Sequence, residues 1–130
     1  MNDAVSTTTL VTIVDDDESV RDALKGFMLS VGFDVASFSS AEDFLVSNFF
    51  DKTSCLIVDL HMSVMSGLDL QTRLNNHHSQ IPMIFFTAHD DPLARAQALR
   101  NGAVEFLRKP FAGESLLDAI DVALGNRGNG

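Results

Sequence analysis

Three short apolar segments of this chain each run into a polar residue that can bind a ligand or react. They are 11–14 before Asp15, 55–58 before Asp59, and 84–86 before Thr87. The stretches between them carry apolar residues at helical spacing, so strands and helices alternate along the chain. Such alternation forms a parallel sheet with helices on both faces, and ligands bind outside the carboxyl ends of its strands. The sequence therefore predicts an α/β fold with these polar residues along one edge of the sheet.

Five strands and five helices account for most of the chain. Strands are predicted over about 9–14, 33–38, 55–60, 81–87 and 104–107. Helices are predicted over about 20–31, from a capped start at 39–43, and over 68–75, 91–101 and 113–125. We expect a doubly wound five-stranded parallel sheet of the flavodoxin-like type in the order 2-1-3-4-5, which is the common order for five such strands.

Composition narrows the class of protein. The chain has 130 residues and a formal net charge of −9, which fits one domain and argues against direct binding of nucleic acid. No apolar stretch approaches the roughly 20 residues of a membrane span, and no secretory signal is visible. Cys55, the single cysteine, is interpreted as a small buried residue. We expect a cytoplasmic domain whose direct partner is neither a membrane nor a nucleic acid.

The predicted strand order brings the polar residues together. The acids at 15–18, Asp59 and Thr87 follow neighbouring strands, and Lys109 lies one strand further away. Clustered carboxylates repel one another unless a dication compensates them, and all-oxygen ligands suit magnesium. A central aspartate can accept a phosphoryl group, whose oxygens a hydroxyl and an ammonium group then stabilise. The edge therefore predicts Mg²⁺-dependent phosphoryl chemistry on Asp59, with Thr87 and Lys109 assisting.

Each of these residues also has an ordinary interpretation. Acids at 15–18 are often a helix N-terminus, and Asp59 at a strand end is often a turn residue. Thr87 alone is more often structural, and Lys109 alone is more often a solvated lysine. Their joint placement at the carboxyl ends of neighbouring strands favours a site.

Four ordered motifs resemble a known family. They occupy 14–18, 59–67, 87–88 and 102–111. Over about 9–124 the chain resembles the receiver domain of two-component response regulators, the CheY-like fold. The first and last motifs are most similar to the FixJ group, whose receivers usually precede a helix-turn-helix DNA-binding domain. The domain is thus expected over 9–124, with a loose lead-in over 1–8 and a tail or linker over 125–130.

The resemblance implies a role for each matching acid. Asp59 matches the aspartate that accepts the phosphoryl group from a histidine kinase. Asp16 matches a direct ligand of Mg²⁺, with Mn²⁺ as a substitute, and Asp15 matches a ligand acting through water. The backbone carbonyl of His61 matches a further metal ligand. Because three aspartates follow one another, it stays open which two of them form the metal-binding pair. Asp17 is also interpreted as a helix cap.

The resemblance also implies a switch. Thr87 matches the hydroxyl that turns toward the phosphoryl group, Phe106 matches the aromatic residue that moves inward with it, and Lys109 matches the lysine that pairs with phosphoryl oxygens. The family's Lys-Pro bond, here Lys109–Pro110, is typically cis. Where the family usually has proline after the methionine matching Met62, this chain has Ser63, so we expect a more mobile loop after Asp59.

Phosphorylation is expected to change the face formed by the fourth helix, fifth strand and fifth helix. The resemblance implies a phosphorylation-dependent homodimer or partner binding through this face. We expect no enzyme activity beyond self-phosphorylation from phosphodonors and self-dephosphorylation. Two histidines near the predicted pocket mouth, His61 and His89, are expected to tune the lifetime of the phosphoryl group, although two exposed loop histidines without a role fit the sequence as well.

Three other functions stay open on the sequence. One is a pseudo-receiver that acts only as an interaction module. Another is a Mg²⁺-dependent phosphohydrolase with an aspartyl-phosphate intermediate, in which the haloacid dehalogenase type places a second acid where this chain has His61. The third is a flavodoxin-like nucleotide binder, which needs a Gly-, Ser- or Thr-rich phosphate loop where this chain has four acids.

Overall fold

The computed structural model describes residues 9–62, 64–109 and 113–125. Its strands are β1 (Leu10–Val14), β2 (Asp34–Phe38), β3 (Cys55–Asp59), β4 (Met83–Thr87) and β5 (Glu105–Arg108). Its helices are α1 (Glu18–Ser30), α2 (Ala41–Leu45), α3 (Gly67–Asn76), α4 (Pro92–Arg100) and α5 (Gly113–Ala123), with a 3₁₀ turn η1 (Phe50–Lys52). All pairings in the sheet are parallel and the order is β2-β1-β3-β4-β5, as predicted.

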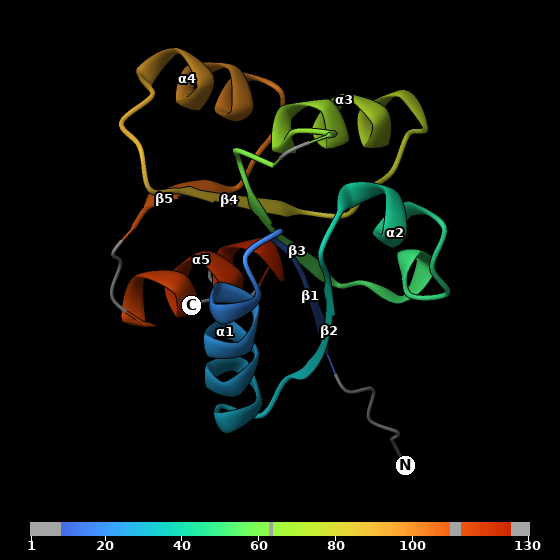
Figure 1. Ribbon diagram of the computed structural model, residues 1–130, viewed down its shortest axis with the longest axis vertical. Helices are drawn as coiled ribbons and strands as arrows, with labels where there is room; N and C mark the ends of the chain where they lie inside the picture. The colour runs from blue at the N-terminus through green and yellow to red at the C-terminus, as the bar shows by residue number, and fades with distance from the viewer. Residues whose placement is uncertain (1–8, 63, 110–112, 126–130) are drawn as a thin grey trace.

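The helices form a layer on each face of the sheet (Figure 1). Helices α1 and α5 pack on one face, with Met28, Leu116 and Ile120 fully buried there. Helices α2, α3 and α4 cover the other, where Phe44 and Leu70 are fully buried. Strands β3 and β4 are buried at every position, as expected for central strands covered on both faces.

Several element bounds differ from the sequence predictions by one or two residues. Strand β4 begins at Met83, not at 81, because Pro82 has no N–H to donate to the ladder and contributes only its carbonyl, to the N–H of Leu56. Strand β5 lies one residue later than predicted, and α5 ends at Ala123. The predicted helix ends at Gly32 and Gly102 are confirmed by their positive φ angles, +100° and +106°.

The register aligns the carboxyl ends of the central strands. Val14 of β1 pairs with Val58 of β3, and Asp59 pairs with Phe86 of β4. Asp15 directly follows Val14, and Asp59 directly follows Val58, so the two acids come after the same pair of residues on neighbouring strands. The fold thus places both acids at one edge of the sheet.

Several sequence predictions fall outside the described residues. These are the lead-in at 1–8, most of the tail at 126–130, Ser63, and the Lys109–Pro110 bond. Within the part of the chain that the structure describes, no helix is long and apolar enough to cross a membrane.

Candidate functional site

Three aspartates meet at the carboxyl ends of β1 and β3. Each of Asp15, Asp16 and Asp59 offers a carboxylate oxygen, and these oxygens all lie within 4.8 Å of one another. Asp15 is fully buried and Asp59 is 9% exposed, whereas Asp16 is exposed to solvent. The predicted acidic cluster is therefore present, with one open side.

Backbone hydrogen bonds hold Asp15 in place. Its N–H donates to the carbonyl of Phe38 on β2, and its Oδ1 accepts from the N–H of Asp17. Asp17 itself caps α1, because its carboxylate accepts from the N–H of Ser19 and of Val20. The hydrogen bonds from Ser19 hold the pKa of Asp17 below its usual value. Of the three consecutive aspartates, Asp17 is therefore the helix cap, and Asp15 and Asp16 are the pair in the cluster.

Burial dominates the electrostatics of Asp15. Loss of water raises its pKa from 3.8 to about 6, and the neighbouring Asp59 carboxylate also raises it. The N–H of Asp17 and the ammonium group of Lys109 act in the opposite direction. None of the described residues donates a hydrogen bond to Asp15 Oδ2, whose cationic neighbour is Lys109 Nζ at 3.7 Å. A buried carboxylate oxygen without a donor is well suited to a cation or to a water bound to one.

Thr87 and Lys109 lie beside the cluster. Thr87 is fully buried at the end of β4, and its Oγ1 accepts from the N–H of His89 at 3.1 Å. The N–H of Lys109 donates to the Thr87 carbonyl at 2.7 Å, so the backbone connects the two residues directly. Lys109 Nζ also lies 4.6 Å from the centre of the Phe86 ring. The structure thus brings the predicted hydroxyl and ammonium groups to the same edge as the acids.

Phe106 lies inward on β5. It is 9% exposed, it pairs in register with Phe85 of β4, and the two ring centroids are 6.3 Å apart. This places the predicted switch aromatic in the core beneath α4, in contact with the strand that ends at Thr87.

The rings of the two histidines, His61 and His89, are in contact with each other. Their ring centroids are 5.4 Å apart in an edge-to-face arrangement. The N–H of His61 donates to Asp59 Oδ1, and its ring Nε2 lies 3.8 Å from Asp91 Oδ2. The sequence placed both rings near the pocket, but their contact and the role of Asp91 were not predicted. The contribution of the His61 carbonyl to metal binding stays a prediction.

The family of the chain follows from comparison with known proteins. Residues 11–121 match the response regulator receiver domain family. The chain belongs to this family. Nodulation protein W of Bradyrhizobium diazoefficiens is 44% identical over 118 residues, which are 91% of this chain and 52% of that protein. The transcriptional regulatory protein TdiR of Thauera aromatica is 41% identical over 114 residues, which are 88% of this chain and 50% of that protein.

Solved structures agree with this assignment. The crystal structure of FixJ-N is similar with a TM-score of 0.83 at 36% identity, covering 92% of this chain and 96% of that chain. The response regulator StyR is similar with a TM-score of 0.82 at 38% identity, covering 95% of this chain and 62% of that chain. The predicted receiver fold is confirmed. This receiver domain spans about half the length of the curated relatives it matches.

Receiver domains are signalling domains that partner with histidine kinases and generally use Mg²⁺. The donor set of this receiver domain fits that ion, because it consists of carboxylates, one of which has a buried oxygen without a hydrogen-bond donor among the described residues. Asp15, Asp16 and Asp59 are the side chains that would hold it.

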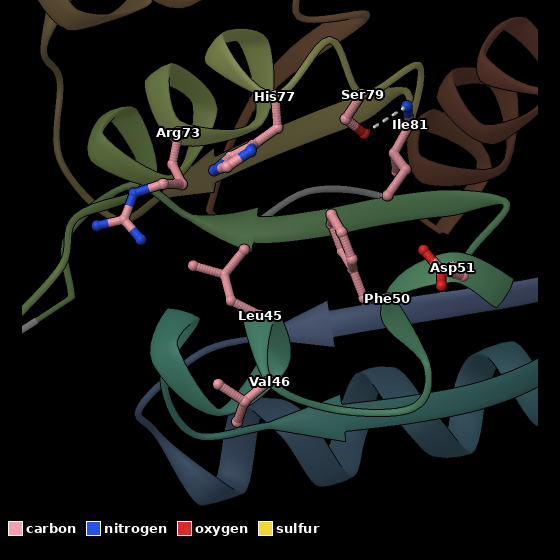
Figure 2. Close-up of a pocket in the computed structure, with 8 residues that line it drawn as sticks. All are labelled: Leu45, Val46, Phe50, Asp51, Arg73, His77, Ser79 and Ile81. Atoms are coloured by element: carbon pink, nitrogen blue, oxygen red, sulfur yellow. Dashed lines mark hydrogen bonds between the residues drawn. The ribbon is translucent and has the colours of Figure 1, made fainter.

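A separate cavity of about 670 Å³ lies far from this edge, where β3 and β4 begin. Figure 2 shows its lining: Leu45 of α2, Val46 directly after it, Phe50 and Asp51 of η1, and Arg73, His77, Ser79 and Ile81 from α3 and the segment after it. This cavity was not predicted from the sequence. The available signal was the apolar run at 44–46, in which Val46 proves to be 85% exposed. None of the predicted site residues lines this cavity.

Proposed function

We propose that this receiver domain accepts a phosphoryl group from a histidine kinase on Asp59. An oxygen of the Asp59 carboxylate attacks phosphorus, the bond from phosphorus to the imidazole nitrogen of the kinase breaks, and that nitrogen takes up a proton. The observation that carries the proposal is the cluster of Asp15, Asp16 and Asp59 oxygens with Lys109 beside it.

The residues around Asp59 have separate parts in this proposal. A bound Mg²⁺, or Mn²⁺ in its place, supplies positive charge to the phosphoryl oxygens and offsets the repulsion among the acids. Lys109 supplies a second, fixed positive charge. The Thr87 hydroxyl turns from the N–H of His89 toward the new phosphoryl group. We propose that this reaction takes place in the cytoplasm.

The output is proposed to pass through the face formed by α4, β5 and α5, called here the output face. Helix α4 carries Arg95 and Arg100 and no acid, whereas the described part of α5 carries three acids and no base. In a two-fold dimer each α4 can meet the partner's α5, and the charges are then complementary. We therefore propose a phosphorylation-dependent homodimer, with DNA contacts, where the full protein makes them, outside this domain.

Intact-mass measurement after incubation with acetyl phosphate tests the proposal. The wild type with Mg²⁺ should gain one phosphoryl group, whereas Asp59→Asn and the wild type in excess EDTA should gain none. Asp51→Asn is the matched control, because Asp51 lies in η1 at the opposite edge of the sheet. Phosphorylation of Asp59→Asn at the wild-type rate would contradict the assignment. Absence of an adduct in the wild type would indicate a pseudo-receiver.

A further inference from the structure

The half-buried Arg21 reaches back from the start of α1 to the strand end that carries the acidic cluster. Its guanidinium Nη1 donates to the backbone carbonyl of Asp15 at 2.8 Å. The backbone N–H of the same arginine donates to the carbonyl of Asp17 at 3.1 Å, which closes the first turn of the helix. Arg21 therefore ties the first turn of α1 to the residue that begins the cluster.

The carbonyl that Arg21 contacts belongs to the peptide group between the two consecutive acids of the cluster, Asp15 and Asp16. Strand β1 ends at Val14, so this carbonyl lies beyond the register pairs of the sheet. A peptide group is planar, and a hydrogen bond that fixes the direction of its C=O also fixes the direction of the Asp16 N–H. The bond from Arg21 thereby restricts where the Asp16 side chain can point.

Asp16 is the exposed member of the cluster, whereas packing holds the other two acids. Asp15 is fully buried and its Oδ1 accepts from the N–H of Asp17, and Asp59 is 9% exposed. Mg²⁺ demands near-ideal octahedral geometry, so a ligand that is oriented before the ion arrives binds it more tightly. We propose that Arg21 is a positioning residue for Mg²⁺: by holding the Asp15 carbonyl it orients Asp16 and raises the affinity of the cluster for the ion.

The sign of the effect separates positioning from simple electrostatics. A guanidinium near the acidic cluster repels an approaching dication, so removal of its charge alone should strengthen Mg²⁺ binding. Loss of the orienting hydrogen bond should weaken binding instead. We expect the second effect to dominate, because water and salt screen the charge of a half-buried arginine, whereas outer partners of metal ligands contribute about 10- to 100-fold to affinity.

Calorimetric titration of the full chain with Mg²⁺ tests this role. Arg21→Met keeps an unbranched apolar stem and a good helix former but removes every donor, and it should bind Mg²⁺ about tenfold more weakly than the wild type. Arg21→Lys keeps the charge and a donor and should recover most of the affinity. The ratio of the Arg21→Met and wild-type dissociation constants should persist at high salt, which screens a charge effect.

Lys25→Met is the matched control, because Lys25 is an exposed cation one turn further along α1. It removes the same charge, and it should bind Mg²⁺ at least as tightly as the wild type. NMR of the metal-free protein in EDTA gives a second measurement that does not depend on the ion. The backbone amide signals of Asp16 and Asp17 should shift in Arg21→Met and stay in place in Lys25→Met.

This inference rests on the Mg²⁺ site of the proposed function, but its test measures ion binding and not phosphorylation, so the two fail separately. Intact-mass phosphorylation of the same samples reports on Asp59 independently. Equal or tighter Mg²⁺ binding by Arg21→Met, an equal loss in Lys25→Met, binding by Arg21→Lys as weak as that by Arg21→Met, or no binding to the wild type would each overturn the role of Arg21.

Discussion

Lys109 Nζ lies 3.7 Å from Asp15 Oδ2, and the carboxylate it approaches is fully buried. The ammonium group favours the charged form of Asp15, yet burial and the Asp59 carboxylate outweigh it and raise the pKa of Asp15 to about 6. In the metal-free protein this acid is therefore held in an unfavourable charged state at neutral pH. A cation in the cluster would relieve it.

The first prediction concerns the stability of the metal-free protein. The folded pKa of Asp15, about 6, lies above its reference value of 3.8, so the folded state binds more protons between these values. This contribution is fully present below pH 3.8 and is lost as the pH rises through about 6. Between pH 7.5 and 5.5, acidification should therefore raise the unfolding free energy by about 1 kcal/mol from this group.

Urea unfolding in EDTA at both pH values measures the effect. Asp15→Asn removes the titrating group and should reduce the pH dependence by that amount, while Asp34→Asn, an exposed position at the start of β2, should leave it unchanged. Excess Mg²⁺ should stabilise the wild type more at pH 7.5 than at 5.5, because it needs the charged carboxylates. A pH dependence that is identical in wild type and Asp15→Asn would disprove this prediction.

The fold could be predicted because burial and strand order have strong local signals. Strands β3 and β4 are continuous apolar runs, and the Ser40 cap of α2 was readable from its neighbours. The end of α2 could not be predicted from the sequence. After Leu45, side-chain hydrogen bonds to the backbone replace helical ones: Ser47 Oγ donates to the Phe44 carbonyl and Thr53 Oγ1 donates to the Phe49 carbonyl. Such bonds compete with helix continuation, and periodicity does not reveal them.

The candidate site could be predicted at the level of which residues lie on the shared edge. Strand ends and strand order suffice for Asp15, Asp59 and Thr87. They do not fix side-chain direction, so the cap made by Asp17 and the contact between His61 and Asp91 needed the structure. These features depend on rotamers and loop paths, which have no periodic signal in the sequence.

The second prediction concerns Gly67 at the start of α3. A Cβ atom there would lie 2.8 Å from the Asp59 carbonyl and 2.8 Å from the Phe85 ring. Gly67→Ala should therefore displace the backbone next to Asp59 and lower the unfolding free energy by about 1–3 kcal/mol. Gly26→Ala is the control, because nothing lies within 4 Å of its added Cβ in the exposed interior of α1, where alanine should stabilise by about 0.5–1 kcal/mol. Equal midpoints of urea unfolding for both variants would contradict the steric argument.

The third prediction links the phosphoryl site to the output face. If the Thr87 hydroxyl turns toward the phosphoryl group, its hydrogen bond from the N–H of His89 is lost, while the carbonyl bond to Lys109 can remain. Beryllofluoride, which mimics a phosphoryl group, should therefore change hydrogen exchange over 88–109 and shift the Phe106 ring signals. Thr87→Ala should abolish the change. A Phe106 ring that keeps one rotamer, with unchanged exchange over that range, would exclude this coupling.

The fourth prediction concerns how long the phosphoryl group lasts. The rings of His61 and His89 are in edge-to-face contact, and the N–H of His61 donates to Asp59 Oδ1, so we expect the two rings at the mouth through which hydrolytic water must reach Asp59. A ring there can block water sterically or orient it as a base, so the direction of the effect is open while its size is not. His61→Ala or His89→Ala should change the dephosphorylation rate at least about threefold, which is roughly 0.7 kcal/mol in the barrier.

His77→Ala is the matched control, because His77 follows the last turn of α3, far from Asp59. Rates are measured by intact mass after removal of the phosphodonor, between pH 6 and 8, in buffers with Mg²⁺ but without transition metals. Lifetimes of both variants equal to that of the wild type across this range would show that the two rings have no part in controlling access of water.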